Sequence, residues 1–76
     1  MIDNFADAMK KKLRLRKNRY VPMAWKTMDH KRLLMLLMEE LTELEESCHK
    51  GNSEEITDEA ADVANYAMFI AELAKL

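Results

Sequence analysis

The scarcity of helix-breaking residues constrains the fold of this chain most strongly. Its 76 residues include one glycine, Gly51, and one proline, Pro22, with 49% hydrophobic and 34% charged residues. A β protein would need more turn residues and more β-branched side chains. We therefore predict an all-α fold with one domain spanning residues 1–76. Because so short a chain forms a single core of marginal stability, we also expect it to oligomerise.

Apolar periodicity and capping residues predict three helices. The first covers about residues 3–17, with Asp3 or Asn4 as its cap. The second begins near His30, after Asp29 as N-cap, and ends at Gly51. The third begins at residue 52 or 53 and runs nearly to the end. The expected apolar stripes are Ile2, Phe5, Met9 and Leu13, continued by Lys12 and Arg16; Leu34, Leu37, Leu41, Leu44 and Cys48; and Ile56, Val63, Tyr66, Ile70 and Leu73.

Cellular location is suggested by what the sequence lacks. The lone Cys48 cannot form an internal disulfide, and its place in the apolar stripe predicts a small buried residue. The apolar runs are too short to cross a membrane, and the N-terminus lacks the order of a signal peptide. We expect a cytoplasmic protein that does not associate with membranes.

Two acidic pairs project toward the predicted core. Glu59 and Asp62 share a helical stripe with Tyr66, and Glu40 and Glu43 lie at the edge of the apolar arc of the preceding helix. Converging buried carboxylates repel one another unless a cation neutralises them. Ligands that are all oxygen favour hard ions, above all Mg²⁺, with Mn²⁺ also possible. Solvated helix-surface charge explains the pattern of Glu59 and Asp62 equally well, and it is the preferred interpretation for four other glutamates, Glu39, Glu45, Glu46 and Glu54.

A motif links these acids to a known family. The segment Glu39-Glu40-Leu41-Thr42-Glu43, followed after fifteen residues by Glu59-Ala60-Ala61-Asp62, resembles the EExxE…ExxD signature of the MazG-like all-α nucleotide pyrophosphohydrolases, including phage and bacterial members. The resemblance implies that Glu40, Glu43, Glu59 and Asp62 bind Mg²⁺, with Glu39 outside the ligand set. It also implies hydrolysis of (deoxy)nucleoside triphosphates to the monophosphate and pyrophosphate.

The resemblance also suggests an assembly. Many members carry a fourth helix after the second motif, whereas this chain stops at Leu76. A homodimer or homotetramer would complete a four-helix-bundle core from three-helix protomers. We expect such an interface to bury the methionine-rich surface made by Met35, Met38 and Met68.

Substrate contacts are expected from two kinds of residue. Basic side chains could hold the outer phosphates, and aromatic side chains near the metal could hold the base. Each assignment competes with an ordinary role in solvation or packing. The candidates for phosphate are Lys12, Arg16 and Arg19; those for the base are Tyr66 and Trp25, with Asn65 reading a base or sugar edge.

Three other functions remain open. A di-iron bundle is suggested by Glu46-Ser47-Cys48-His49, but this Glu-x-x-His motif occurs once and projects outward. A nucleic-acid-binding module rests only on the basic stretch from Lys10 to Arg19, in a chain with a net charge of −2. A non-catalytic helical dimerisation or regulatory protein that keeps the fold is compatible with every pattern above.

Overall fold

A computed structural model describes residues 1–15 and 24–75 of the chain. These residues form the α-helices α1 (Ile2–Leu15), α3 (His30–Lys50) and α4 (Ser53–Leu73), and a short 3₁₀ helix, η1 (Ala24–Thr27), with no strand among them. The predicted all-α fold is therefore confirmed. Helix α1 begins at Ile2, so Asp3 and Asn4 both lie in its first turn rather than at the cap. The predicted end of this helix at residues 16–17 lies outside the described residues.

The boundaries of α3 and α4 follow from their capping residues. The side chain of Asp29 accepts a hydrogen bond from the backbone N–H of Arg32 at 2.8 Å, and that of Asn52 accepts one from Glu55 at 3.0 Å. Gly51 ends α3 with φ 80°, a left-handed conformation that side-chain-bearing residues rarely adopt. The predicted caps Asp29 and Gly51 are confirmed, as is the predicted start of the third helix at residue 52 or 53. The short connection makes α3 and α4 neighbours.

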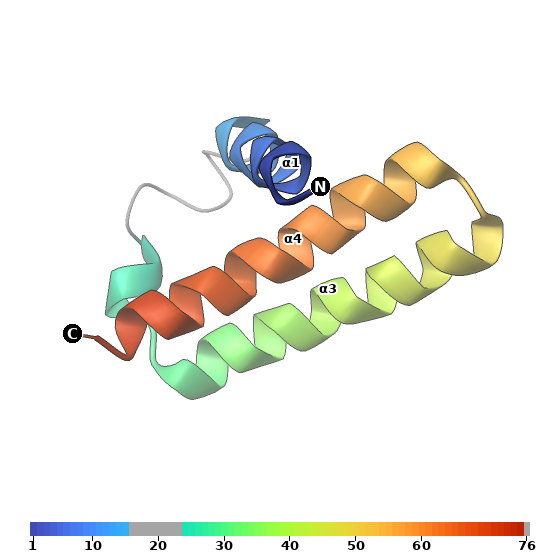
Figure 1. Ribbon diagram of the computed structural model, residues 1–76. Helices are drawn as coiled ribbons and strands as arrows, with labels where there is room; N and C mark the ends of the chain where they lie inside the picture. Colours follow the sequence, from blue (N-terminus) through green and yellow to red (C-terminus); the bar gives the residue numbers. More distant parts are fainter. Residues whose placement is uncertain (16–23, 76) are drawn as a thin grey trace.

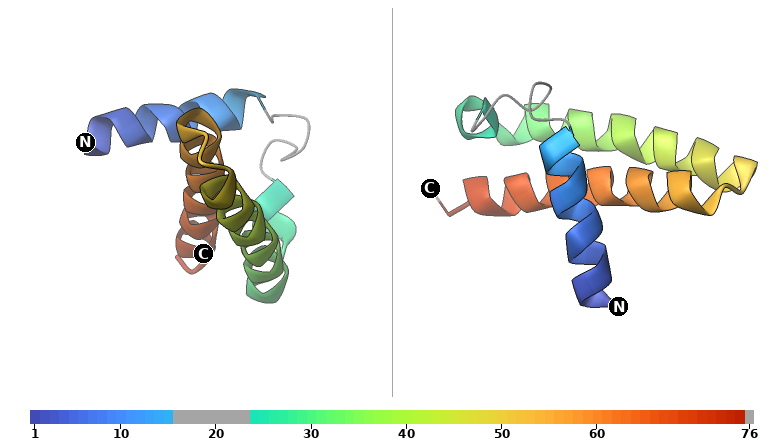
Figure 2. Two further views of the ribbon diagram at one scale, coloured as in Figure 1. Left: turned by 90° about the vertical axis from the view of Figure 1, so that its right-hand side faces the viewer. Right: turned by 90° about the horizontal axis from the view of Figure 1, so that it is seen from above.

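The two long helices form an antiparallel hairpin, and α1 lies across α4 (Figures 1 and 2). The buried apolar centre consists of Leu33 from α3 with Tyr66 and Phe69 from α4, and partly buried residues of α1 and η1 pack around it. Contacts of α1 are made mainly with α4. One side of α3 therefore faces α4, while its far side has no apolar neighbour within the described part of the chain.

The inward face of α3 differs from the predicted stripe. Ser47 is buried and Cys48 is exposed, which is the reverse of the expected burial of the cysteine. Leu34 and Leu41 are also about half exposed, whereas Leu33 and Glu40 point inward. Six consecutive apolar residues, 33–38, surround this helix, so periodicity alone could not select the face that meets α4. The observed face keeps Leu37 and Leu44 of the predicted stripe, which are partly buried, and has Leu33, Glu40 and Ser47 in place of Leu34, Leu41 and Cys48.

Candidate metal centre

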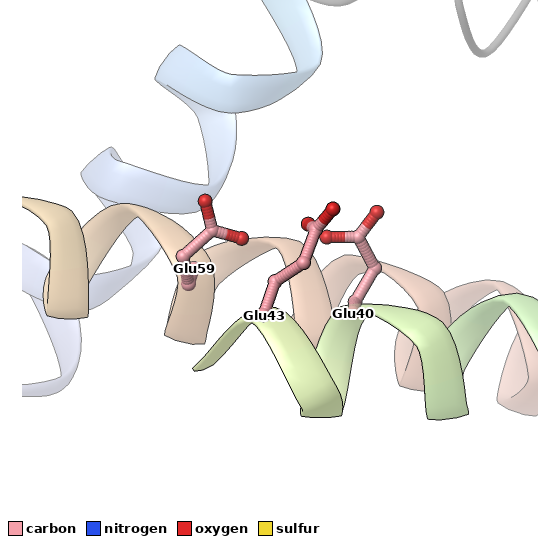
Figure 3. Close-up of side chains that lie close together, drawn as sticks. All are labelled: Glu40, Glu43 and Glu59. Atoms are coloured by element: carbon pink, nitrogen blue, oxygen red, sulfur yellow. The ribbon is translucent and has the colours of Figure 1, made fainter. Parts of the chain in front are cut away.

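Three glutamates from two helices converge at the α3–α4 interface. Glu40 and Glu43 lie one turn apart on α3, and Glu59 reaches them from α4; one carboxylate oxygen of each lies within 4.8 Å of the others. All three carboxyl groups are directed to the same side of the two helices (Figure 3). Glu40 is buried, with 2% of its surface exposed, Glu59 is half-buried and Glu43 is exposed. The cluster is therefore buried at Glu40 and open to solvent at Glu43, which forms its rim.

The arrangement fits a hard divalent cation. Two oxygens on opposite sides of Mg²⁺ are about 4.2 Å apart, twice its metal–oxygen distance of about 2.1 Å. The glutamate oxygens lie within 4.8 Å of one another, so side-chain rotations would bring them to the spacing of about 3.0 Å between neighbouring ligands and about 4.2 Å between opposite ones. Among the described residues, the groups of ligating side chains close enough to hold a metal contain only these carboxylates, without histidine or cysteine. An all-oxygen set with an open rim is typical of Mg²⁺ sites that retain water or bind phosphate.

Asp62, the fourth predicted ligand, has a different partner. Its Oδ2 lies 3.4 Å from Nζ of Lys12, and the two side chains are 0% and 9% exposed. The pair forms where α1 crosses α4, because the apolar side of α1 that packs on α4 carries Lys12 inward with it. The structure thus brings Glu40, Glu43 and Glu59 together and places Asp62 beside them in a buried ion pair.

The glutamate cluster carries unfavourable negative charge. The pKa of Glu59 is raised above its ordinary value of 4.5, first by burial, then by the charge and hydrogen bond of Glu43 and the charge of Asp62, while Lys12 lowers it. Oε2 of Glu59 is buried without a hydrogen-bond partner among the described residues. A group held in this way favours either a proton or a cation at its oxygen.

Neutralising Glu59 should therefore stabilise the metal-free protein. A raised pKa means that the folded state binds this proton more tightly than the unfolded state, so the free energy of unfolding falls as pH rises above 4.5 through the raised pKa. We expect Glu59→Gln to raise the midpoint of thermal unfolding at pH 7, without metal, by roughly 2–5 °C. The substitution should also reduce the stabilisation gained on adding Mg²⁺.

Differential scanning fluorimetry with and without chelator measures both effects. Glu46→Gln, which changes an exposed glutamate of α3 outside the cluster, is the matched control and should leave the midpoint unchanged. A metal-free Glu59→Gln protein less stable than the wild type at pH 7 would show that the Glu59 charge is not destabilising.

An aromatic pocket lies one helical turn from the acids. Trp25 of η1 stacks on Phe69 with ring centroids 5.5 Å apart and an interplanar angle of 6°, and Tyr66 meets Phe69 edge-on at 5.8 Å. A cavity of about 210 Å³ is lined by these rings and by Arg32, Leu33 and Leu36. Pockets for drug-sized ligands measure roughly 300–1,000 Å³, so this smaller cavity suits a single ring system. Both predicted base contacts, Trp25 and Tyr66, line it.

The other predicted substrate residues lie elsewhere. Asn65 is fully buried, donates a hydrogen bond to the carbonyl of Met9 at 3.1 Å and lines a groove beneath α1 rather than the aromatic pocket. Lys12 forms the buried ion pair with Asp62. Arg16 and Arg19 lie outside the described residues. Sequence reasoning did not identify Arg32 or Phe69 as site residues, because neither belongs to a recognisable motif.

Two further sequence features can be placed. The Glu-x-x-His motif is not assembled into a metal site: His49 is exposed, and its Nε2 lies 3.9 Å from Glu45 on the outer surface of α3. In the described part of the chain, the helices are too short or too polar to cross a membrane.

Comparison with known proteins places the chain in a family. Residues 3–75 match the profile of the family described as phosphoribosyl-ATP pyrophosphohydrolase. An uncharacterized protein of Archaeoglobus fulgidus is 41% identical over 49 residues, which are 64% of this chain and 53% of that protein. The chain therefore spans about half the length of this relative. No solved structure matches it.

The matched family is one of the MazG-like all-α nucleoside triphosphate pyrophosphohydrolases, so the resemblance seen in the acidic motifs is confirmed at this level. Members are typically metal-dependent, in accord with a cluster of three glutamates that could bind a metal. The match covers both acidic motifs and all of the described helices. This chain belongs to the phosphoribosyl-ATP pyrophosphohydrolase family.

Proposed function

We propose that this protein hydrolyses (deoxy)nucleoside triphosphates to the monophosphate and pyrophosphate in a reaction that requires Mg²⁺, with Mn²⁺ as a substitute. The observation that carries the proposal is the convergence of Glu40, Glu43 and Glu59, with oxygens within 4.8 Å of one another at a half-open site. Family membership supports pyrophosphohydrolase chemistry. The resemblance of the acidic motifs supports nucleoside triphosphates as the substrates.

The three glutamates would hold the cation, and Asp62 lies beside them as a candidate fourth ligand. When bound, the cation neutralises phosphate charge and lowers the pKa of an attacking water. Water attacks the α-phosphorus, the bond from this phosphorus to the bridging oxygen of the β-phosphate breaks, and the pyrophosphate leaves. The proton of the attacking water passes to a carboxylate oxygen of the cluster that the cation does not hold.

Substrate orientation follows from the order of residues along the hairpin. Leu36 precedes Glu40 by one turn on α3, and Tyr66 follows Asp62 by one turn on α4, so the aromatic pocket begins about 6 Å along the helices from the acids. We place the base in this pocket beside Trp25 and Tyr66 and the phosphates at the glutamates. Lys12 adds positive charge near the phosphates through its position beside Asp62.

A second copy of the chain is the proposed partner. Leu34, Met35, Met38 and Leu41 are each about half exposed on the side of α3 that faces away from α4, and Met68 is exposed on α4. Burying this α3 surface against its counterpart would complete a four-helix core. Sedimentation equilibrium tests the arrangement: a dimer or tetramer at micromolar concentration is expected, and a monomer would contradict it.

Product analysis tests the proposed activity. The protein is incubated with each common nucleoside and deoxynucleoside triphosphate and with Mg²⁺, and the products are separated by anion-exchange chromatography. We expect equal amounts of monophosphate and pyrophosphate from at least one substrate, and no turnover after chelation. Absence of turnover with every substrate, or release of orthophosphate and a diphosphate, would refute the proposal. The first outcome would favour the alternative of a non-catalytic helical protein that keeps the fold.

A further inference from the structure

An apolar surface runs along the side of α3 that faces away from α4. Residues 33–38 are six consecutive apolar residues, and a helix that is apolar all round is normally buried on every side. Helix α4 covers only one side: Leu33 is 0% exposed, whereas Leu34, Met35 and Met38 are 51%, 55% and 58% exposed. Contiguous exposed apolar side chains of this kind mark an interaction site. We call this surface the outer stripe; it consists of Leu34, Met35, Met38 and Leu41.

The outer stripe contains a groove that can receive an apolar side chain. The groove has a volume of about 310 Å³ and is lined by Met35, Met38, Glu39 and Thr42. These residues occupy positions i, i+3, i+4 and i+7 of the helix, the four positions that surround an inserted side chain when two helices pack knobs into holes. The side chain that fills such a hole projects from a facing helix. The groove therefore fits a second helix lying along the outer stripe.

The charges that flank the outer stripe indicate which helix this is. Lys31 precedes Met38 by seven residues and Glu45 follows it by seven, so both share the face of α3 that carries Met38. Within residues 1–15 and 24–75, the exposed Lys31 forms no ion pair. Glu45 is 76% exposed and lies 3.9 Å from His49. The stripe thus has a positive charge before it and a negative charge at the same distance after it.

This pattern is self-complementary when two copies of α3 run antiparallel. In an interface with two-fold symmetry, a residue i that meets residue j of the second copy is matched by j meeting i. With the axis at Met38, Lys31 meets Glu45 of the second copy at both ends of the stripe. A parallel pair would instead bring Lys31 against Lys31 and Glu45 against Glu45, and like charges repel. Charge therefore favours a second copy of this chain, in one orientation.

We infer that two copies of the chain associate through antiparallel α3 helices, with a two-fold axis at Met38, Met38 of each copy inserted into the groove of the other, and Lys31 paired with Glu45 of the other. The inference rests on the proposed partner and specifies its orientation and contacts. Glu40 follows Met38 by two residues, which places it about 200° around the helix, where it is buried. The glutamate cluster of each copy therefore lies outside the interface.

Charge reversal tests the pairing. Lys31→Glu and Glu45→Lys each turn both attractive pairs of the dimer into repulsive ones, so we expect the dissociation constant of each homodimer to rise by at least about tenfold. An equimolar mixture of the two variants restores both pairs in a heterodimer, whose dissociation constant should lie within about threefold of the wild-type value. Sedimentation velocity measures all three. Lys50→Glu changes an exposed charge of α3 outside the stripe and, as the control, should leave the association unchanged.

Cross-linking locates the two-fold axis. A Cys48→Ser background removes the natural exposed thiol, and Met38→Cys then places one thiol of each copy next to the axis. Oxidation with diamide should convert most of the dimer to a disulfide-linked form on a non-reducing gel. Leu41→Cys is the matched control, because it lies three residues from the axis and its two copies are therefore about 9 Å apart along the helices. A disulfide needs Cα atoms within about 7 Å, so this variant should not cross-link.

Three results would each overturn the inference. They are a wild-type protein that stays monomeric at millimolar concentration, which would leave the outer stripe to a different partner; charge-reversed variants that associate as tightly as the wild type; and efficient cross-linking of Leu41→Cys. Circular dichroism confirms that the variants remain helical. A dimer with these contacts that releases no pyrophosphate from any triphosphate would refute the proposed activity alone. Turnover by a monomer would refute the interface and leave the activity standing.

Discussion

Replacing Glu40 with glutamine is expected to reduce Mg²⁺-dependent pyrophosphate release by at least about hundredfold, because loss even of groups that only support a ligand costs 10–100-fold in metal affinity or activity. Glu40 is the most buried member of the cluster and the one closest to the aromatic pocket along α3. Glutamine keeps the size and helix propensity of the side chain but removes its charge. Turnover is measured over a range of Mg²⁺ concentrations, and circular dichroism confirms that the helices persist.

Glu39→Gln is the matched control for this experiment. Glu39 is adjacent in sequence, yet its side chain is exposed and lies outside the glutamate cluster. We expect its turnover to remain within about twofold of the wild type, since surface substitutions away from a site have small effects. Equal losses in both variants, or full activity in Glu40→Gln, would remove Glu40 from the metal site.

Replacing Lys12 with methionine is expected to have the largest effect on stability. The change removes the ammonium group that forms the buried ion pair with Asp62, whose side chain is fully buried. Breaking a buried pair from one side typically costs about 3–5 kcal/mol. We expect the free energy of unfolding in urea, measured without metal, to fall by about 3 kcal/mol. Because both side chains are more than 90% buried, solvent screening reduces this value little.

Two further variants test the origin of that loss. Lys11→Met changes an exposed neighbour and should alter stability by less than about 0.5 kcal/mol. The double variant Lys12→Met with Asp62→Asn removes both charges of the pair and should recover most of the loss. A double variant as unstable as Lys12→Met would mean that packing of the lysine stem, rather than the ion pair, stabilises the contact between α1 and α4.

Local signals in the sequence were sufficient to predict the boundaries of α3 and α4. Asp29, Gly51 and Asn52 act within one turn of their own position, through hydrogen bonds to nearby backbone or through a left-handed φ. These interactions do not depend on the rest of the fold. The acidic motifs were predictable for a similar reason, because their spacing fixes which side chains share a face of one helix.

Features that depend on how helices meet were not predictable. Ser47 is buried instead of Cys48. Periodicity could not predict this, because apolar residues surround α3 at positions 33–38 and do not select the face that meets α4. The pairing of Lys12 with Asp62 needs α1 to cross α4 at that position. Arg32 belongs to no motif, and it lines the aromatic pocket only because η1 carries Trp25 to the start of α3. Helical projection treats each helix alone, so it cannot predict which side chains meet where three elements pack together.

The most direct test of the account locates the metal itself. Crystals grown with Mn²⁺ and a non-hydrolysable nucleoside triphosphate analogue would be measured at a wavelength where manganese scatters anomalously. We predict an anomalous peak within coordination distance of Glu40, Glu43 and Glu59, on the side to which their carboxyl groups point. No peak at these residues in crystals that contain the bound analogue, or a peak held by other side chains, would contradict the assignment of this cluster as the metal centre.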